Sequence, residues 1–150
     1  MANEIQTVIS HVSVGTNDFE KARKFYERLL STLGCRVLVE HAGAVGFGKV
    51  YPEFWLGTPF DGRRASPGNG CHVSFVAQSK AEVDAFFKEA PAAGATEDGD
   101  PGHRHDYGEP YYGCFVRDLD GNKIEATFWD MELAKKLGMA NPMSLMPALS

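Results

Sequence analysis

The chain lacks the features that mark several large classes of protein. It has three cysteines but no CxxC pair, and no apolar run is long enough to cross a bilayer. No basic stretch followed by an apolar one occurs at the start, so no signal peptide is expected. An odd cysteine count without a secretion signal favours reduced thiols and therefore a cytoplasmic protein.

Strong charge of one sign is also missing. The formal net charge is −5 and the basic residues are scattered, which argues against nucleic acid and anionic membranes as partners. The sequence has no glycine-rich phosphate loop and no nucleophile elbow. Its composition, 43% hydrophobic and 23% charged, is that of one globular domain, predicted to span residues 1–150.

What the chain does contain is an internal repeat. Residues 11–14 (His-Val-Ser-Val) recur as residues 72–75 (His-Val-Ser-Phe), and the same offset superposes Phe25 on Phe86. Self-similarity at a fixed offset indicates one supersecondary unit used twice. Each copy of the strand opens with a histidine, a residue that can bind metal or move protons.

The first copy, here called module one, is predicted over residues 8–57. Residues 8–15 alternate like a strand, and Asp18 is a typical N-cap for an amphipathic helix that ends at Gly34. Three short strands are then predicted, at residues 36–40, 45–49 and 53–57. The order is βαβββ, and residues 58–70, rich in glycine and proline, are predicted to be a linker.

The second copy, module two, is predicted over residues 71–129. Ser79 and Glu82 have the spacing of a capping box for a helix that Pro91 and Gly94 are expected to end. Residues 96–110 are polar and turn-rich and are predicted to be a long loop. The elements predicted after that loop are strands at residues 112–117 and 123–128, joined by a tight turn, and a C-terminal tail at residues 130–150 with a short helix ending near Leu137.

The candidate chemistry lies in His11, His72 and Glu125. The two histidines occupy matching positions in the repeat, and Glu125 is a carboxylate within the last strand. Two histidines and one carboxylate on one face form a triad that binds a divalent metal and leaves positions open for substrate. These ligands suit Fe, Mn, Ni, Zn or Co, so they do not select the metal.

The chain resembles the vicinal oxygen chelate superfamily, which includes glyoxalase I, extradiol dioxygenases, fosfomycin-modifying enzymes and bleomycin-binding proteins. The resemblance rests on residues 11–14, Phe25-Tyr26, His72 and above all residues 115–125 (Phe-Val-Arg-Asp-Leu-Asp-Gly-Asn-Lys-Ile-Glu). It implies an α+β fold in which duplicated βαβββ modules form a cupped mixed sheet. It also implies that His11, His72 and Glu125 bind one divalent metal ion, and that the protein is a homodimer.

One departure from glyoxalase I concerns a fourth ligand. The resemblance places a second glutamate on the last strand of module one, but here that position falls within residues 54–56 (Phe-Trp-Leu), which do not coordinate metals. Glu53 is adjacent, on the opposite face of the strand from Phe54 and Leu56. A site with three protein ligands is therefore expected.

Further candidates come from outside the triad. His105 is predicted as a catalytic base, with Glu125 as the other catalytic residue. The predicted substrate contacts are Phe54, Trp55, His103 and Tyr111.

Three functions follow from the resemblance. The leading one is a glyoxalase-like lyase or isomerase, in which the metal stabilises an oxyanion or enolate of a small-molecule substrate. The first alternative is an Fe(II) extradiol-type dioxygenase, because two histidines and one carboxylate are the ligands which that chemistry uses. The second is a metal-free protein that sequesters a flat or cationic drug, which the acidic net charge and Trp55 would permit.

Overall fold

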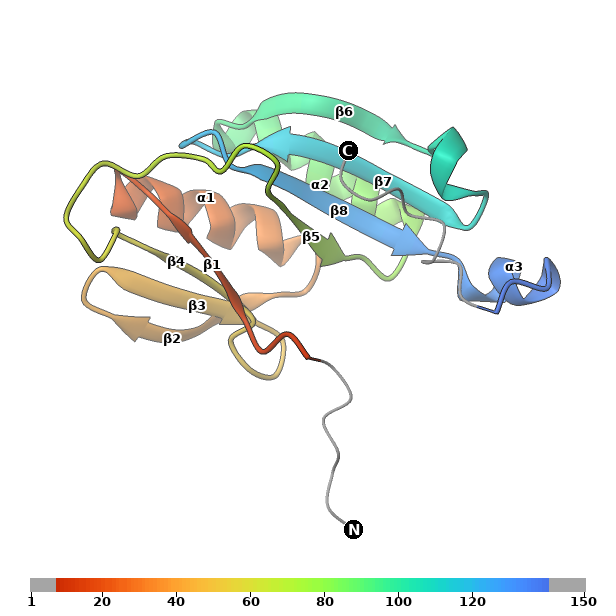
Figure 1. Cartoon of the computed structure of the whole chain (residues 1–150), viewed down its shortest axis with the longest axis horizontal. Helices are drawn as coiled ribbons and strands as arrows, with labels where there is room; N and C mark the ends of the chain where they lie inside the picture. Colours follow the sequence, from red (N-terminus) through yellow and green to blue (C-terminus); the bar gives the residue numbers. More distant parts are fainter. Residues whose placement is uncertain (1–7, 141–150) are drawn as a thin grey trace, which may run out of the picture.

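The computed structural model describes residues 8–140, and these residues form two four-stranded sheets with a long helix on each (Figure 1). Sheet A, built by module one, has the strand order β1-β4-β3-β2. Its elements are β1 (Val12–Gly15), α1 (Phe19–Ser31), β2 (Arg36–His41), β3 (Ala44–Gly48) and β4 (Phe54–Gly57). The pairing of β1 with β4 is parallel and the other two pairings are antiparallel.

Sheet B, built by module two, repeats the same plan with the order β5-β8-β7-β6. Its elements are β5 (His72–Val76), α2 (Lys80–Ala93), β6 (Thr96–Gly102), β7 (Tyr111–Arg117) and β8 (Lys123–Trp129), followed by α3 (Met131–Lys136). A short 3-10 helix, η1 (His105–Tyr107), lies between β6 and β7. The predicted duplication of a βαβββ unit and the α+β class are confirmed.

Both long helices begin where the sequence indicates. The Asp18 and Ser79 side chains accept hydrogen bonds from the amides of Lys21 and Glu82, which caps α1 and α2. The expected end of α2 at Gly94 is confirmed, but the expected part of Pro91 in ending it is wrong, because the helix continues through Pro91 to Ala93. Proline in the last turn removes a single backbone hydrogen bond, and Gly94 then ends the helix in the left-handed region at φ 104°.

The long loop predicted for residues 96–110 is also wrong over its first half, which forms β6. This strand lies at the edge of sheet B, where β7 is its one partner among the described strands. Its register shifts on either side of Gly99, and Pro101 is tolerated because an edge strand leaves some amides unpaired. Turn-type residues therefore mark a bulged edge strand here. The predicted tail beyond residue 140 lies outside the described residues.

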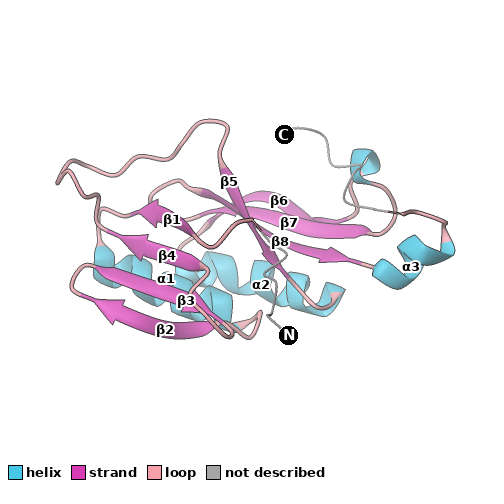
Figure 2. Ribbon diagram, turned by 60° about the horizontal axis from the view of Figure 1, so that its bottom comes forward, coloured by secondary structure: helices cyan, strands magenta, loops and turns pink. Residues whose placement is uncertain are grey.

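The hydrophobic core lies between the helices and one face of each sheet. Figure 2 shows α1 and α2 on the same side of the two sheets. Phe54, predicted as a substrate contact, is only 3% exposed and packs against Tyr26, Phe47 and Phe75 in this core. The structure therefore gives Phe54 a core role. The opposite face of each sheet is not covered by these helices, so functional side chains can lie there.

The β7–β8 turn joins the two modules. Asp118, which is 6% exposed, accepts hydrogen bonds from the amides of Asp120 and Asn122 within the turn. Its Oδ2 also accepts from the Tyr26 hydroxyl of α1, at 2.5 Å. Part of the motif at residues 115–125 thus fixes the turn and holds module one against module two.

Candidate functional site

Alternation along β5 and β8 presents His72 and Glu125 on the same face of sheet B. The residues of these strands that pack in the core are Val73, Phe75, Ile124 and Ala126. His72 and Glu125 are their neighbours in the chain and therefore point away from α2. The parallel register sets Ser74 beside Glu125, so His72 lies one residue pair along the same face.

His72 and Glu125 meet in a mostly buried pair. The Glu125 side chain is 1% exposed and that of His72 is 18% exposed, and His72 Nε2 lies 3.2 Å from Glu125 Oε2. Despite this short distance the imidazole is not aligned to donate a hydrogen bond. Within the described part of the chain, Glu125 Oε2 has no hydrogen-bond partner. A buried carboxylate oxygen without a donor is costly, so this atom is a candidate to bind a group other than the side chains and amides of residues 8–140.

The other carboxylate oxygen is fixed by Tyr111. The Tyr111 hydroxyl donates to Glu125 Oε1 at 2.6 Å, and the tyrosine is fully buried. Burial, and then the hydrogen bond to Glu125 and its charge, raise the pKa of Tyr111 well above its usual value, so the phenol stays a donor. Tyr111, predicted to contact substrate, instead holds Glu125.

Gly113 makes this contact possible. It lies opposite Thr127 in the β7–β8 pairing, two residues from Tyr111 on the same face of β7. A Cβ added at Gly113 would lie 2.7 Å from Cζ of Tyr111, so the tyrosine ring occupies the space that any side chain would take. The sequence reasoning missed this residue, although a glycine inside a strand signals close approach by another group.

The pair fits two ligands of a divalent cation. Metal bonds to histidine nitrogen and carboxylate oxygen are about 2.1 Å long, so two such ligands at right angles lie about 3 Å apart. Nε2 of His72 and Oε2 of Glu125 match this spacing without bonding each other. Tyr111 supplies the outer hydrogen bond that typically orients a metal-binding carboxylate.

The third predicted ligand, His11, is not part of this cluster. His11 is exposed and precedes β1, and its Nδ1 lies 3.0 Å from Ser10 Oγ. Across residues 8–140, no three His, Cys, Asp or Glu side chains are gathered so that they could hold a metal ion. The structure therefore brings together two of the three predicted ligands.

The register of module one identifies the counterpart of Glu125. Ser13 pairs with Trp55 in sheet A as Ser74 pairs with Glu125 in sheet B, so Trp55 occupies the position of the missing fourth ligand. The Trp55 ring stacks on His41 with an interplanar angle of 3°. A Cβ on Gly46 would lie 3.0 Å from the indole, which explains the glycine beneath it. The exposed Glu53 lies before β4, and its carbonyl accepts from the Val12 amide.

His103 and His105 lie outside the Glu125 pair, in the segment after β6, which approaches the start of α2 through His103. His105 is fully exposed, with Nδ1 3.4 Å from Asp106 Oδ1. Nε2 of His103 lies 3.3 Å from Nζ of Lys80, a residue that the sequence reasoning treated only as part of a helix start. A catalytic role for His105 stays a prediction.

Comparison with known proteins agrees with this architecture. The sequence model of the Glyoxalase/Bleomycin resistance protein/Dioxygenase superfamily matches residues 8–126. No curated protein matches significantly. Among solved structures, a glyoxalase/bleomycin resistance protein from Albidiferax ferrireducens is 39% identical, with a TM-score of 0.72 over 81% of this chain and 98% of that one.

More distant structures share the fold. A glyoxalase/bleomycin resistance protein/dioxygenase family enzyme from Burkholderia phytofirmans is 17% identical, with a TM-score of 0.62 over 81% of this chain and 98% of that one. The fosfomycin resistance protein FosX from Listeria monocytogenes is 18% identical, with a TM-score of 0.57 over 81% of this chain and 92% of that one. The chain belongs to the Glyoxalase/Bleomycin resistance protein/Dioxygenase superfamily.

Proposed function

We propose that the protein is a metal-dependent lyase or isomerase that acts on a small molecule with two neighbouring oxygen atoms. His72 and Glu125 hold the divalent ion, and His11 completes the site. The observation that carries the proposal is Glu125 Oε2, which is buried, accepts no hydrogen bond from residues 8–140 and lies 3.2 Å from His72 Nε2.

The two oxygen atoms of the Glu125 carboxylate then have different roles. Oε1 accepts from Tyr111, which fixes the plane of the carboxylate, and Oε2 is free to bind the ion. A bound divalent ion supplies Lewis-acid stabilisation of negative charge on substrate oxygens. Burial of Glu125 keeps water from this side of the carboxylate, which strengthens its interaction with a cation.

We propose that His11 comes from a second copy of the chain, in a homodimer. The repeat gives His11 the same place at the start of β1 that His72 has at the start of β5. His11 is exposed and is not gathered with the other two ligands within one chain. A symmetric dimer would therefore contain two equivalent sites, each with ligands from both subunits.

The absence of a fourth protein ligand supports chelation of substrate. Because Trp55 occupies the position equivalent to Glu125, three protein ligands leave up to three positions open on an octahedral ion. Two of these suffice for neighbouring substrate oxygens. The indole of Trp55, stacked on His41, is then a wall of the substrate pocket.

Metal binding tests the ligand set. After dialysis against Mn²⁺ or Zn²⁺, elemental analysis of the wild-type protein should find about one ion per chain. His72→Ala and Glu125→Gln should each lose it, whereas His103→Ala, outside the site, should retain it. Equal metal content in Glu125→Gln and the wild type would overturn the proposal.

Mixed dimers test whether His11 acts across subunits. Neither His11→Ala nor His72→Ala alone should bind metal. If the ligands come from two subunits, unfolding and refolding the two variants together creates dimers with one intact site. Metal content should then rise from near zero to about one quarter of an ion per chain. No recovery, in a mixture shown to form mixed dimers, would place the three ligands in one chain.

The contacts of Trp55 favour the drug-sequestering alternative as a second candidate, because Trp55 and His41 offer a stacked aromatic surface. Binding of a flat cationic drug that persists in EDTA would support it. The Fe(II) dioxygenase alternative shares the ligand set. Oxygen consumption by the Fe(II)-loaded protein with a panel of catechols would distinguish it from the lyase or isomerase.

A further inference from the structure

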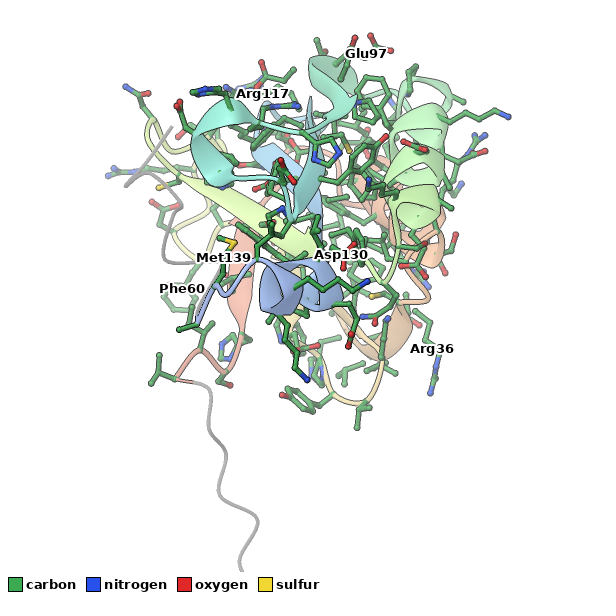
Figure 3. The ribbon with its side chains drawn as sticks, turned by 90° about the vertical axis from the view of Figure 1, so that its right-hand side faces the viewer. Arg36, Phe60, Glu97, Arg117, Asp130 and Met139 are labelled. Carbon is green, nitrogen blue, oxygen red and sulfur yellow. The ribbon has the colours of Figure 1, made fainter. Side chains whose placement is uncertain are left out.

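An open cleft lies at the end of sheet B, away from the Glu125 pair. Figure 1 shows η1 and α3 at this end of the molecule, and Figure 3 labels Asp130, which caps the start of α3. The cleft has a volume of about 470 Å³, and its lining includes Lys80, His103, His105, Glu109 and Leu133. This volume lies within the range of small-molecule sites, about 300–1,000 Å³.

The cleft contains the ammonium group of Lys80, which forms no ion pair with the part of the chain that the structure describes. Among the described residues, no carboxylate oxygen lies within 4.0 Å of Lys80 Nζ. Its neighbours are His103 Nε2, at 3.3 Å, and the ring of Tyr112, whose centroid lies 5.3 Å away. The His103 ring is itself set edge-on against Tyr112, with centroids 5.4 Å apart. Two nitrogen-bearing side chains from different elements are thus held side by side.

The nearby acidic groups do little to neutralise them. Asp84 accepts from the Tyr112 hydroxyl at 2.7 Å, and Asp106 lies beside the exposed His105. Glu109 is the one carboxylate among the lining residues of the cleft. Lys80 is also the first residue of α2, so the partial positive charge of a helix N-terminus adds to the local potential.

Arg104 also lines the cleft, but its guanidinium lies over Phe115, a ring that contacts His72 on the opposite face of sheet B from Tyr112. Its Nη2 donates to the Asp100 carbonyl at 2.8 Å, and its guanidinium lies 5.7 Å from the centroid of Phe115. A Cβ on Gly99 would lie 3.1 Å from Nη2, so the glycine in β6 makes room for the arginine. Backbone and ring contacts hold Arg104 here without neutralising it.

We propose that this cleft binds the phosphate group of a small molecule through Lys80 and His103. The ammonium group and the imidazole approach from α2 and from the segment after β6. A phosphate monoester carries a charge of about −1.5 to −2 at pH 7, so a cationic site attracts it more strongly than a singly charged carboxylate. A phosphate group fills only part of the volume. Leu133 and Gly108 border the rest, which suits an organic body of modest polarity.

Binding of phenyl phosphate in EDTA tests the proposal, because a chelator removes any ion that could attract phosphate to His72 and Glu125. Calorimetric titration should show binding to the wild type that weakens as salt rises. Lys80→Ala should weaken it about tenfold, the loss of one charge-assisted hydrogen bond. Lys136→Ala, an exposed lysine of α3 outside the cleft, is the matched control and should bind like the wild type.

Two further variants guard against a general loss of structure. Glu109→Gln should tighten binding because it removes the lining carboxylate, and His103→Ala should weaken it. In NMR spectra, phenyl phosphate should shift the amide signals of residues 103–109 and leave that of His72 unchanged. The proposal fails if the wild type shows no binding at millimolar phenyl phosphate, if Lys136→Ala weakens binding as much as Lys80→Ala, or if benzoate binds as tightly.

Discussion

At the scale of single residues, the hydrogen bond from Tyr111 orients the carboxylate of Glu125. Tyr111→Phe should remove the only hydrogen bond to Oε1 described in the structure and let the carboxylate turn. We expect metal affinity to fall about 10- to 100-fold, as for other outer partners of metal ligands. Calorimetric titration with Mn²⁺ measures this. Tyr107→Phe, on a neighbouring ring, is the control, and equal affinities of Tyr111→Phe and the wild type would contradict the assignment.

The residue scale also shows what the sequence could predict about the site. The family resemblance implied that His72 and Glu125 lie in one site, and the two side chains do meet. The repeat could not show where His11 lies, because the placement of one sheet against another depends on contacts distant in sequence. The charge of Lys80 was overlooked for the same reason, since His103 reaches it across 23 positions.

At the scale of elements, β7 carries two consecutive tyrosines that face opposite sides of sheet B. The hydrogen bond to Asp84 raises the pKa of Tyr112 to about 12, and burial raises that of Tyr111 further. Above about pH 10 the unfolded chain loses these protons while the folded chain keeps them. The free energy of unfolding should therefore fall as the pH rises from 10 to 12. Urea unfolding across this range measures it, and Tyr112→Phe should make the decline shallower. An unchanged slope would contradict this cause.

The β7–β8 turn is the second element with a measurable role. Asp118→Ala should leave the buried Tyr26 hydroxyl and two turn amides without their acceptor. Each unsatisfied group costs about 1–3 kcal/mol, so we expect a loss of at least about 3 kcal/mol in urea unfolding. Adding Tyr26→Phe should recover part of this loss. If the double variant is no more stable than Asp118→Ala, the tyrosine contact is not the cause.

The sequence predicted elements best where the chain pairs locally. The β7–β8 hairpin and both helix starts follow from short-range signals at Asp18, Ser79 and Gly121. By contrast, β6 was predicted as a loop because Gly99, Pro101 and Gly102 are poor strand formers. Its pairing with β7 overrides that preference.

For the whole molecule, the structure predicts that the two modules unfold together. Contacts such as Tyr26–Asp118 and Arg28–Glu89 cross between them, and α1 packs against α2. The chain has two tryptophans, Trp55 in sheet A and Trp129 in sheet B. In Trp129→Phe and Trp55→Phe, fluorescence reports one module at a time. Each fluorescence curve should coincide with the circular-dichroism curve of the same variant, and divergence of the two would reveal independent modules.

A further property of the whole molecule concerns membrane-spanning helices. Among residues 8–140, no helix combines the length and apolar character that a bilayer crossing requires. The two sheets and their helices extend from β1 to β8, and the superfamily match, which covers residues 8–126, ends within β8.

Because the two modules share one fold, a residue of one module can be compared with the residue at the equivalent position of the other. Where the halves agree for a structural reason, as in the helix caps Asp18 and Ser79, the shared architecture is a sufficient explanation. Where they disagree, as Trp55 does with Glu125, the shared backbone accommodates both side chains, so the fold alone does not select either one. Exchanging residues between the halves would therefore separate what folding needs from what chemistry needs.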